Sequence, residues 1–306
     1  MSCFKIIEGG LLSLIQDNGR FGLCHKGLTQ SGSMDEYAYR VANQLLGNSQ
    51  NTNCIEITLG GLKLECDDSC TISVCGADAK FTINGQVAGI WRTHHLHKGD
   101  VLGFKFATSG VRTYLCVNGG FDIPPELGSC ATTIKEGIGG LNGKSLQKGD
   151  IVNFSNNTLQ KEYHIHKATF IPRYTQNLTL RVILGYQDSY FERKEVEKFF
   201  SQTYTILPEN NRMGYKLKSD PIHCTIGGII SEGISFGAIQ IPKDGQPIIL
   251  LKDRQTIGGY PKIGSVLPID CFKLAQLRTG SQVTFEAISI TLAQEKMKLF
   301  YESFGY

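Results

Sequence analysis

The stretch "GAIQIPKDGQPIILLKDRQTIGGYP", residues 237–261, contains a strong strand–turn–strand signal. Two apolar runs, "GAIQI" and "PIILL", flank a turn in which Pro242 and Pro247 bracket Lys-Asp-Gly, and this pattern predicts a β-hairpin. Residues 253–264, "DRQTIGGYPKIG", follow the hairpin and combine a charged pair, an amide, a hydroxyl and two adjacent glycines. This 253–264 segment is therefore the first candidate for a functional site.

Strand signals continue on either side of that stretch. Period-two alternation in "KLECD", "TISVC", "KFTIN", "DVLGFKF", "RTYLCV" and "DIVNF" predicts half-buried strands, and Asn84-Gly85 predicts a two-residue hairpin turn. A turn-then-strand unit occurs three times, as "HKGDVLGF" from His97, "QKGDIVNF" from Gln147 and "RTGSQVTF" from Arg278. We interpret it as a favoured turn closing a barrel strand, with related sub-barrels as the alternative. With 35 glycines in 306 residues, these patterns predict a mainly β (α+β) fold.

Three segments are predicted to be helices. Residues 33–47, "SMDEYAYRVANQLLG", begin with a capping box from Ser33 to Glu36, and residues 189–200 begin in the same way at Ser189. The third segment, residues 291–304, carries apolar residues at helical spacing.

The length allows two domains, each with its own core. Residues 155–178 break the strand pattern with polar residues and one proline. We therefore predict two β-rich domains, residues 1–160 and residues 175–306, with a few flanking helices.

Composition excludes several classes of function. The net charge of +3 has no basic block, which argues against nucleic-acid binding. The N-terminus lacks signal-peptide features and no apolar run reaches the ~20 residues of a membrane helix, so we predict a cytoplasmic protein without membrane contact. The ten cysteines are scattered without a CxxC pair, which favours buried thiols over disulfides or metal ligands.

Two motifs resemble ligand sites but fail on spacing. "GIGGLNGKS", residues 137–145, has Ile138 where a phosphate loop requires glycine. Of His94, His95 and His97, alternation places only His95 and His97 on one strand face, so no metal site is predicted.

Residues around the 253–264 segment offer donors that suit planar amides and carboxylates. An arginine binds a carboxylate through two N–H groups, and glycine lets the backbone approach a ligand closely. The second half supplies Arg212, Gln240, Gln246, Asp253, Arg254, Gln255, Thr256, Gly258, Gly259 and Tyr260. From "LIQDNGRFG" come Gln16, Asp17 and Arg20, for which a turn with a local Asp–Arg pair is an equally good explanation.

The chain resembles a known family along nearly its whole length. "QDNGRFG", "SGSMDEYAYRVANQLLGN", "LRVILGYQDSYF", "NRMGYKL" and "SEGISFGAIQIPKDGQPIILLKDRQTIGGYPKIGSV" are similar to the KipA-like proteins, which are also known as the C-type subunit of 5-oxoprolinase or as allophanate hydrolase subunit 2. These are related to the carboxyltransferase region of biotin-dependent urea carboxylase. The resemblance implies cyclophilin-like β-barrels.

The resemblance also implies an activity and partners. Together with the A-type subunit and the KipI-like B-type subunit of 5-oxoprolinase, such a chain is expected to cleave 5-oxoproline to glutamate using ATP. No phosphate loop is found here, so ATP is expected to bind elsewhere or through an unrecognised motif. Two alternatives stay open: carboxyl transfer from carboxybiotin carried by another protein, and non-catalytic binding of a KipI-like kinase inhibitor. A homo-oligomer also stays open.

The resemblance leads to a hypothesis about roles. Gln255, Thr256 and the N–H groups of Gly258 and Gly259 would face the lactam amide or its oxyanion, and Asp253 would orient an arginine or transfer a proton. The remaining residues would bind substrate: Arg212, Gln240, Gln246, Arg254, Tyr260, Gln16, Asp17 and Arg20.

Overall fold

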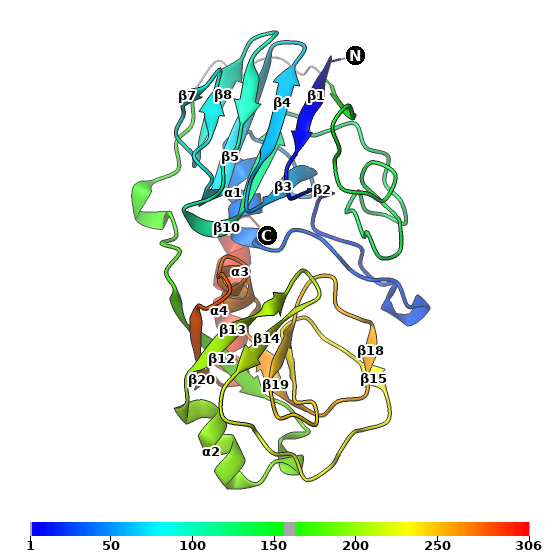
Figure 1. The fold of residues 1–306 in the computed structure, drawn as a ribbon, viewed down its shortest axis with the longest axis vertical. Helices are drawn as coiled ribbons and strands as arrows, with labels where there is room; N and C mark the ends of the chain where they lie inside the picture. The colour runs from blue at the N-terminus through cyan, green and yellow to red at the C-terminus, as the bar shows by residue number, and fades with distance from the viewer. Residues whose placement is uncertain (1, 156–162, 306) are drawn as a thin grey trace. The chain divides into compact units, whose positions relative to one another are not determined.

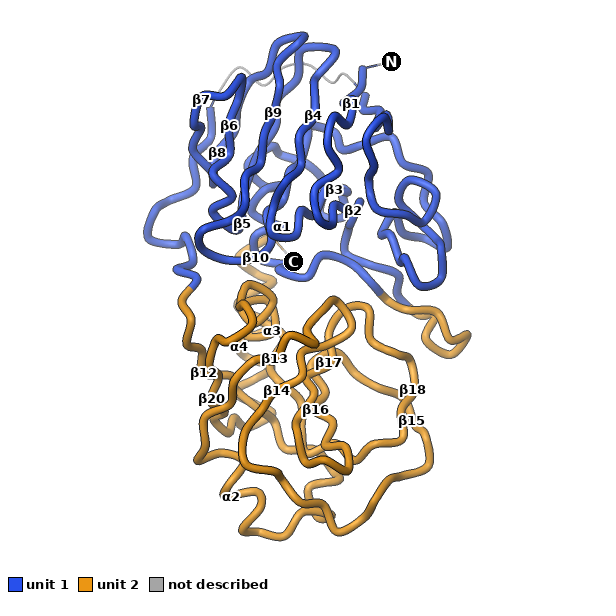
Figure 2. The backbone as a smooth tube through the Cα atoms, in the orientation of Figure 1, with its two compact units in different colours: residues 1–21, 31–174 blue, residues 22–30, 175–306 orange. Residues whose placement is uncertain are grey.

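The computed structural model describes residues 2–155 and 163–305. The chain divides into two compact units (Figure 2). Unit 1 comprises residues 1–21 and 31–174, and unit 2 comprises residues 22–30 and 175–306. The predicted linker, residues 155–178, includes residues 156–162, which lie outside the described part. The ranges 1–160 and 175–306 stay a prediction about domains.

Unit 1 contains two antiparallel sheets that share one apolar core (Figure 1). One sheet has the order β11 (Ile151–Phe154), β1 (Ser2–Gly9), β4 (Leu62–Cys66), β9 (Val101–Gly103), β6 (Thr82–Ile83) and β7 (Gln86–Val87). The other has the order β2 (Leu12–Gln16), β3 (Cys54–Thr58), β10 (Ser109–Val117), β5 (Cys70–Asp78) and β8 (Arg92–Leu96). A 3-10 turn, η2 (Ala168–Phe170), also belongs to this unit.

Strand β5 is buried on both faces, because the core covers one and helix α1 (Glu36–Leu45) covers the other. Ile72 and Val74 point into the core between the sheets. Ser73, on the opposite face, donates a 2.6 Å hydrogen bond to the carbonyl of Ala42 in α1. Alternation of side chains along a strand explains why neighbouring residues meet different layers.

The repeated turn-then-strand unit adopts one conformation in its three copies. Each glycine has a φ between 85° and 93°, a region that favours glycine, and a strand follows. The side chain after the glycine accepts the backbone N–H three positions earlier, in the pairs His97–Asp100, Gln147–Asp150 and Arg278–Ser281. The prediction of a favoured turn before a strand is confirmed.

Unit 2 is built around a closed barrel (Figure 1). Its order is β12 (Asn177–Leu184), β19 (Lys262–Val266), β16 (Ala238–Gln240), β17 (Ile248–Leu250), β14 (Gly214–Lys218), β13 (Tyr204–Asn210) and β20 (Gln282–Ala287). Parallel pairing of β12 with β20 closes the barrel. The remaining elements are β15 (Glu232–Gly233), β18 (Ile257–Gly258), α2 (Arg193–Ser201), α3 (Pro268–Leu274), α4 (Ile290–Glu302), η1 (Cys24–Lys26) and η3 (Asp188–Tyr190).

Several predictions about elements are confirmed and two are wrong. The fold is mainly β, "GAIQI" and "PIILL" form the β16–β17 hairpin, and Asn84-Gly85 joins β6 to β7. The helix starts are wrong. Asp35, not Ser33, caps α1 by accepting from Ala38 N at 3.1 Å, while Ser33 Oγ donates to the Asp17 carbonyl. Helix α2 begins at Arg193, because Ser189, the predicted start, lies within the short turn η3.

The cysteines and histidines have ordinary structural surroundings. All ten cysteines are free thiols, and seven of them are buried as predicted. His94 Nε2 lies 2.7 Å from the Gly89 carbonyl, and His95 Nδ1 lies 3.0 Å from the Thr71 hydroxyl. Each ring therefore has a protein partner.

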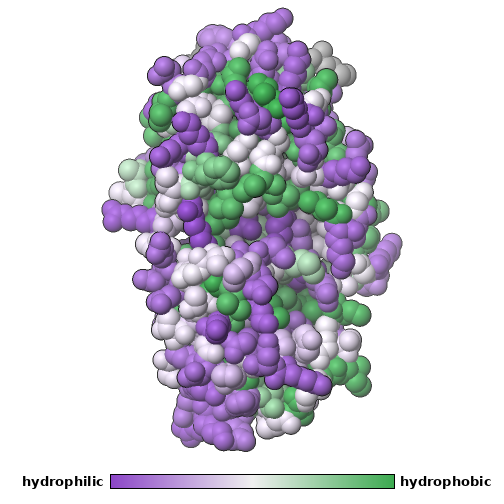
Figure 3. All heavy atoms as spheres, in the orientation of Figure 1, coloured by the Kyte–Doolittle hydropathy of each residue, from purple (hydrophilic) through white to green (hydrophobic). Residues whose placement is uncertain are grey.

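Hydrophilic and hydrophobic residues are mixed on the viewed surface of both units (Figure 3). Across residues 2–155 and 163–305, none of the helices combines the length and apolar character needed to cross a membrane.

Candidate functional site

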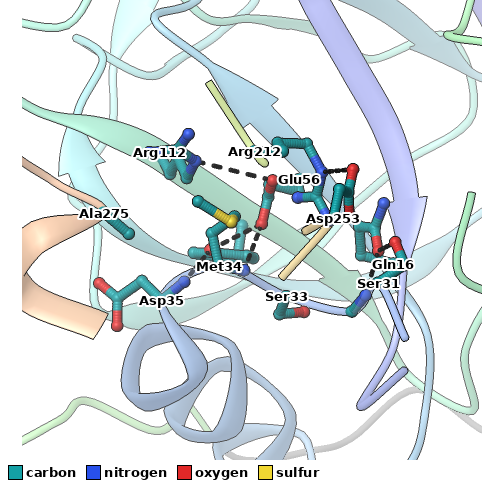
Figure 4. A network of polar contacts seen from close by, with 12 residues as sticks. Gln16, Ser31, Ser33, Met34, Asp35, Glu56, Arg112, Arg212, Asp253 and Ala275 are labelled. Atoms are coloured by element: carbon teal, nitrogen blue, oxygen red, sulfur yellow. Dashed lines mark hydrogen bonds and ion pairs between the residues drawn. The ribbon is translucent and has the colours of Figure 1, made fainter. Parts of the chain in front are cut away.

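Arg212 and Asp253 form a bidentate ion pair at the loops that follow β13 and β17 (Figure 4). Arg212 Nε lies 2.8 Å from Asp253 Oδ2, and its NH2 nitrogen lies 3.0 Å from Oδ1. The side chains are only 6% and 16% exposed. A partly buried, two-point pair fixes the plane of the guanidinium, so the geometry suits a carboxylate that orients an arginine.

Arg254 joins three segments of unit 2 by hydrogen bonds. Its Nε donates to the Ile234 carbonyl at 3.1 Å, one terminal nitrogen donates to Leu251 O at 3.2 Å, and the other donates to Gln30 Oε1 at 3.2 Å. Burial lowers the pKa of Arg254. Its predicted contact with substrate remains untested.

Residues 256–259 of the 253–264 segment form one strand of a short ribbon, whereas residues 262–264 belong to β19 of the barrel. β18 pairs with β15, and hydrogen bonds from Ile234 N to Thr256 O and from Ile229 N to Gly259 O extend the pairing. Gln255 is exposed, Thr256 is half-buried and Tyr260 is 44% exposed. The segment therefore holds residues 229–234 beside the barrel (Figure 1).

The structure brings Gln240 to this ribbon but places Gln246 elsewhere. A Cβ on Gly258 would lie 2.6 Å from Gln240 Nε2, so the two residues are neighbours. Gln246 uses its amide on Ser219, accepting from the backbone N–H at 3.0 Å and donating to the carbonyl at 3.2 Å.

In unit 1, Gln16, Asp17 and Arg20 hold residues 126–133 in place. Arg20 donates to the carbonyls of Glu126, Ser129 and Ala131 and to the Thr133 hydroxyl. Asp17 accepts from Gly19 N, Ser129 Oγ and Cys130 N, each at 2.7 Å. Gln16 donates to Thr132 O and accepts from Gly32 N. Their proposed contact with substrate remains a prediction.

Unit 1 also contains a buried carboxylate that the sequence did not single out. Glu56 on β3 accepts from Met34 N and from the Tyr114 hydroxyl, both at 2.8 Å, and its Oε1 lies 3.8 Å from Arg112 Nε (Figure 4). Burial raises the pKa of Tyr114. Of the residues in this cluster, Met34 lies in the segment "SGSMDE", which the sequence had singled out as a helix start. Glu56 itself lies in none of the segments that the sequence singled out.

A second cluster missed by the sequence lies in unit 2 around Glu232. Its carboxylate accepts hydrogen bonds from Lys262 Nζ, Tyr186 Oη and Gln187 Nε2. The Lys262 and Tyr186 hydrogen bonds lower the pKa of Glu232, and the Glu232 contact raises that of Tyr186. Lys262 is in the 253–264 segment, but its partners are far away in sequence.

Known proteins resemble the chain over most of its length. Residues 26–287 match the family described as carboxyltransferase domain, subdomain A and B. The C-type subunit of 5-oxoprolinase from Haemophilus influenzae is 37% identical over 288 residues, which cover 93% of this chain and 90% of that protein. Its counterpart from Escherichia coli K12 is 33% identical over 308 residues, which cover 99% and 97%.

A more distant likeness comes from a solved structure. The crystal structure of K. lactis urea amidolyase matches 99% of this chain with a TM-score of 0.92 and 27% identity, although the match covers only 20% of that protein. The chain therefore belongs to the carboxyltransferase-domain family, subdomains A and B, and is homologous to the C-type subunit of 5-oxoprolinase over nearly its full length.

Proposed function

We propose that the chain is one component of an ATP-dependent 5-oxoprolinase complex that converts 5-oxo-L-proline to L-glutamate. The observation that carries the proposal is the two-way alignment with the C-type 5-oxoprolinase subunits of two bacteria, each covered at 90% or more. Its partners would be the A-type subunit and the KipI-like B-type subunit, and ATP would be used by the assembled complex.

The chemistry requires donors that stabilise charge on the lactam carbonyl. Water attack turns the planar amide into a tetrahedral oxyanion, and one preorganised donor there lowers the barrier by about 3–4 kcal/mol. Exposed Gln255, with Thr256 and the N–H groups of Gly258 and Gly259, would supply such donors. Arg212, oriented by Asp253, would hold the substrate carboxylate.

The test is ATP-dependent release of glutamate from 5-oxoproline by this chain with its A-type and B-type partners. Omitting any one component should abolish turnover. Gln255→Ala should lower turnover by roughly a hundredfold without loss of stability, because the side chain is exposed. Gln86→Ala, an exposed glutamine of β7 in unit 1, is the matched control and should keep full activity. Full turnover in Gln255→Ala would remove this segment from the catalytic site.

Carboxyl transfer is a second candidate, favoured by the 0.92 TM-score with K. lactis urea amidolyase. In that case a carboxybiotin carried by another protein would be the donor. Carboxyl transfer from a biotinylated partner, together with no glutamate release in the full mixture of components, would favour it. Stable binding to the KipI-like partner without either reaction would favour the regulatory role.

A further inference from the structure

A pocket of about 320 Å³ lies in unit 2 along β19. Glu232, Gly233 and Ser235 line it, and the 253–264 segment holds their stretch of chain through the β15–β18 pairing and the Arg254–Ile234 hydrogen bond. Tyr186 and Gln187, which follow β12, also line the pocket and hydrogen-bond to Glu232. The pocket is therefore built from three separate parts of the chain that the fold brings together.

Gly264 on β19 is one of the residues that line the pocket. A Cβ on Gly264 would lie 2.5 Å from the Ile183 carbonyl, so glycine lets β19 approach β12 closely. The hydroxyls of Ser235 and Ser265, 3.3 Å apart, line the pocket next to it. The volume lies at the lower end of the range of small-molecule sites and suits a ligand of metabolite size.

Hydrogen bonds to Gln187 fix the positions of the polar groups that line the pocket. Gln187, only 3% exposed, accepts from the Lys262 backbone N–H at 2.8 Å and donates to Glu232 at 2.6 Å and to Tyr186 Oη at 2.9 Å. Its amide therefore positions the other groups. The Lys262 side chain is 12% exposed, and its ammonium has three N–H donors, of which the Glu232 ion pair uses one.

We propose that this pocket binds a small carboxylate that carries an N–H group next to the carboxylate, as an amino acid or its lactam does. Arg212 does not line this pocket, so the pocket is a binding place separate from the Arg212–Asp253 pair, and within it the Lys262 ammonium holds the carboxylate of the ligand. The Glu232 carboxylate, with Tyr186 beside it, accepts the N–H. The choice of 5-oxo-L-proline and L-glutamate as ligands rests on the proposed function, whereas the requirement for a carboxylate rests on the pocket alone.

The test is isothermal titration calorimetry on the full chain with 5-oxo-L-proline, L-glutamate and 2-pyrrolidinone, the lactam without a carboxylate. We expect saturable binding of at least one carboxylate ligand and at least about tenfold weaker binding of 2-pyrrolidinone. Lys262→Met, which keeps the backbone contact to Gln187, should weaken binding of the carboxylate ligand by a similar factor. Lys216→Met is the matched control, because Lys216 pairs with Asp244 at 2.9 Å on the same barrel and does not line the pocket.

Three results would overturn the proposal: no saturable binding of either carboxylate, equal binding of 2-pyrrolidinone, or unchanged binding by Lys262→Met. Glu232→Gln adds a test of the nitrogen site. The ammonium of glutamate needs the negative charge of Glu232, whereas the neutral lactam N–H needs only an oxygen acceptor. The substitution should therefore weaken the binding of glutamate more than the binding of 5-oxoproline. Equal losses would contradict the placement of the ligand nitrogen at Glu232.

The two proposals fail separately. Glutamate release by the full complex without binding to this pocket would keep the proposed function and reject the pocket. Binding to the isolated chain that depends on Lys262, without glutamate release in the full mixture of components, would keep the pocket and reject the proposed function.

Discussion

Glu232 shows how a single residue acquires its properties from distant parts of the chain. Its three donors come from residues 186, 187 and 262, so no local motif could reveal it. The segments "LRVILGYQDSYF" and "SEGISFGAIQ" contain Tyr186, Gln187 and Glu232, and Lys262 lies in the 253–264 segment. Strand patterns in these segments do not show which side chains meet in the fold. A hydrogen-bonded cluster of this kind is a property of the fold, because it requires the positions of β15, β19 and the residues after β12.

The shifted pKa of Glu232 predicts a pH dependence of stability. Its pKa in the folded chain lies below the ordinary value of 4.5, so its interactions stabilise the fold above that pH and are lost as the pH falls through the folded pKa. Because the pair with Lys262 is partly exposed, its contribution is at most about 1 kcal/mol. Urea unfolding should show that Glu232→Gln lowers the free energy of unfolding near pH 7 and that this difference shrinks as the pH falls below 4.5 and through the folded pKa. A difference that stays constant over this range would contradict the assignment.

At the scale of elements, the close approach of β12 and β19 predicts the effect of a single methyl group. In Gly264→Ala the added Cβ would meet the Ile183 carbonyl at 2.5 Å, and backbone can yield only by moving a strand. We expect a loss of about 1–3 kcal/mol in the free energy of unfolding. Gly233→Ala on β15 is the control, since nothing lies within 4 Å of its added Cβ. Similar losses in the two variants would show that strand spacing is not the cause.

The start of α1 provides a second prediction at this scale. Asp35 accepts from Ala38 N at 3.1 Å and from the Tyr174 hydroxyl at 3.0 Å, whereas Ser33 makes no cap hydrogen bond to α1. Asp35→Ala should therefore cost about 0.5–2 kcal/mol in the free energy of unfolding. Asp35→Asn keeps a capping oxygen and should recover part of that loss in thermal or urea denaturation. If Ser33→Ala lowered the free energy of unfolding more than Asp35→Ala, the result would support Ser33 as the cap, as the sequence predicted.

Comparison of the turns, the hairpin and the α1 cap shows what local sequence can and cannot predict. Glycine conformation and a neighbouring acceptor are enough to specify the three turn-then-strand units, and two prolines are enough to mark the β16–β17 hairpin. The capping box failed because Ser33 bonds to Asp17, a tertiary contact that no helix rule contains. The candidate site divides in the same way: Arg212 and Asp253 do form a pair, whereas the amide of Gln246 is used on Ser219.

At the scale of the whole molecule, the chain does not divide into units at a single point. Residues 22–30 group with unit 2, although they lie inside the stretch that was predicted to be the first domain. Polar composition marked residues 155–178 as a break, but nothing in residues 22–30 distinguishes them from an ordinary loop. Their placement depends on contacts such as Gln30 with Arg254, more than two hundred residues away.

This arrangement predicts an effect of Gln30 on the barrel. Gln30 Oε1 accepts a 3.2 Å hydrogen bond from the buried guanidinium of Arg254, which also supports Ile234 and Leu251. Gln30→Ala would leave that donor without its side-chain acceptor and should cost about 1–3 kcal/mol. Hydrogen exchange followed by mass spectrometry should show faster exchange in peptides covering residues 248–258, while peptides covering β5 keep their protection. Unchanged exchange around Arg254, or an equal loss of protection in β5, would mean that residues 22–30 are not a structural part of unit 2.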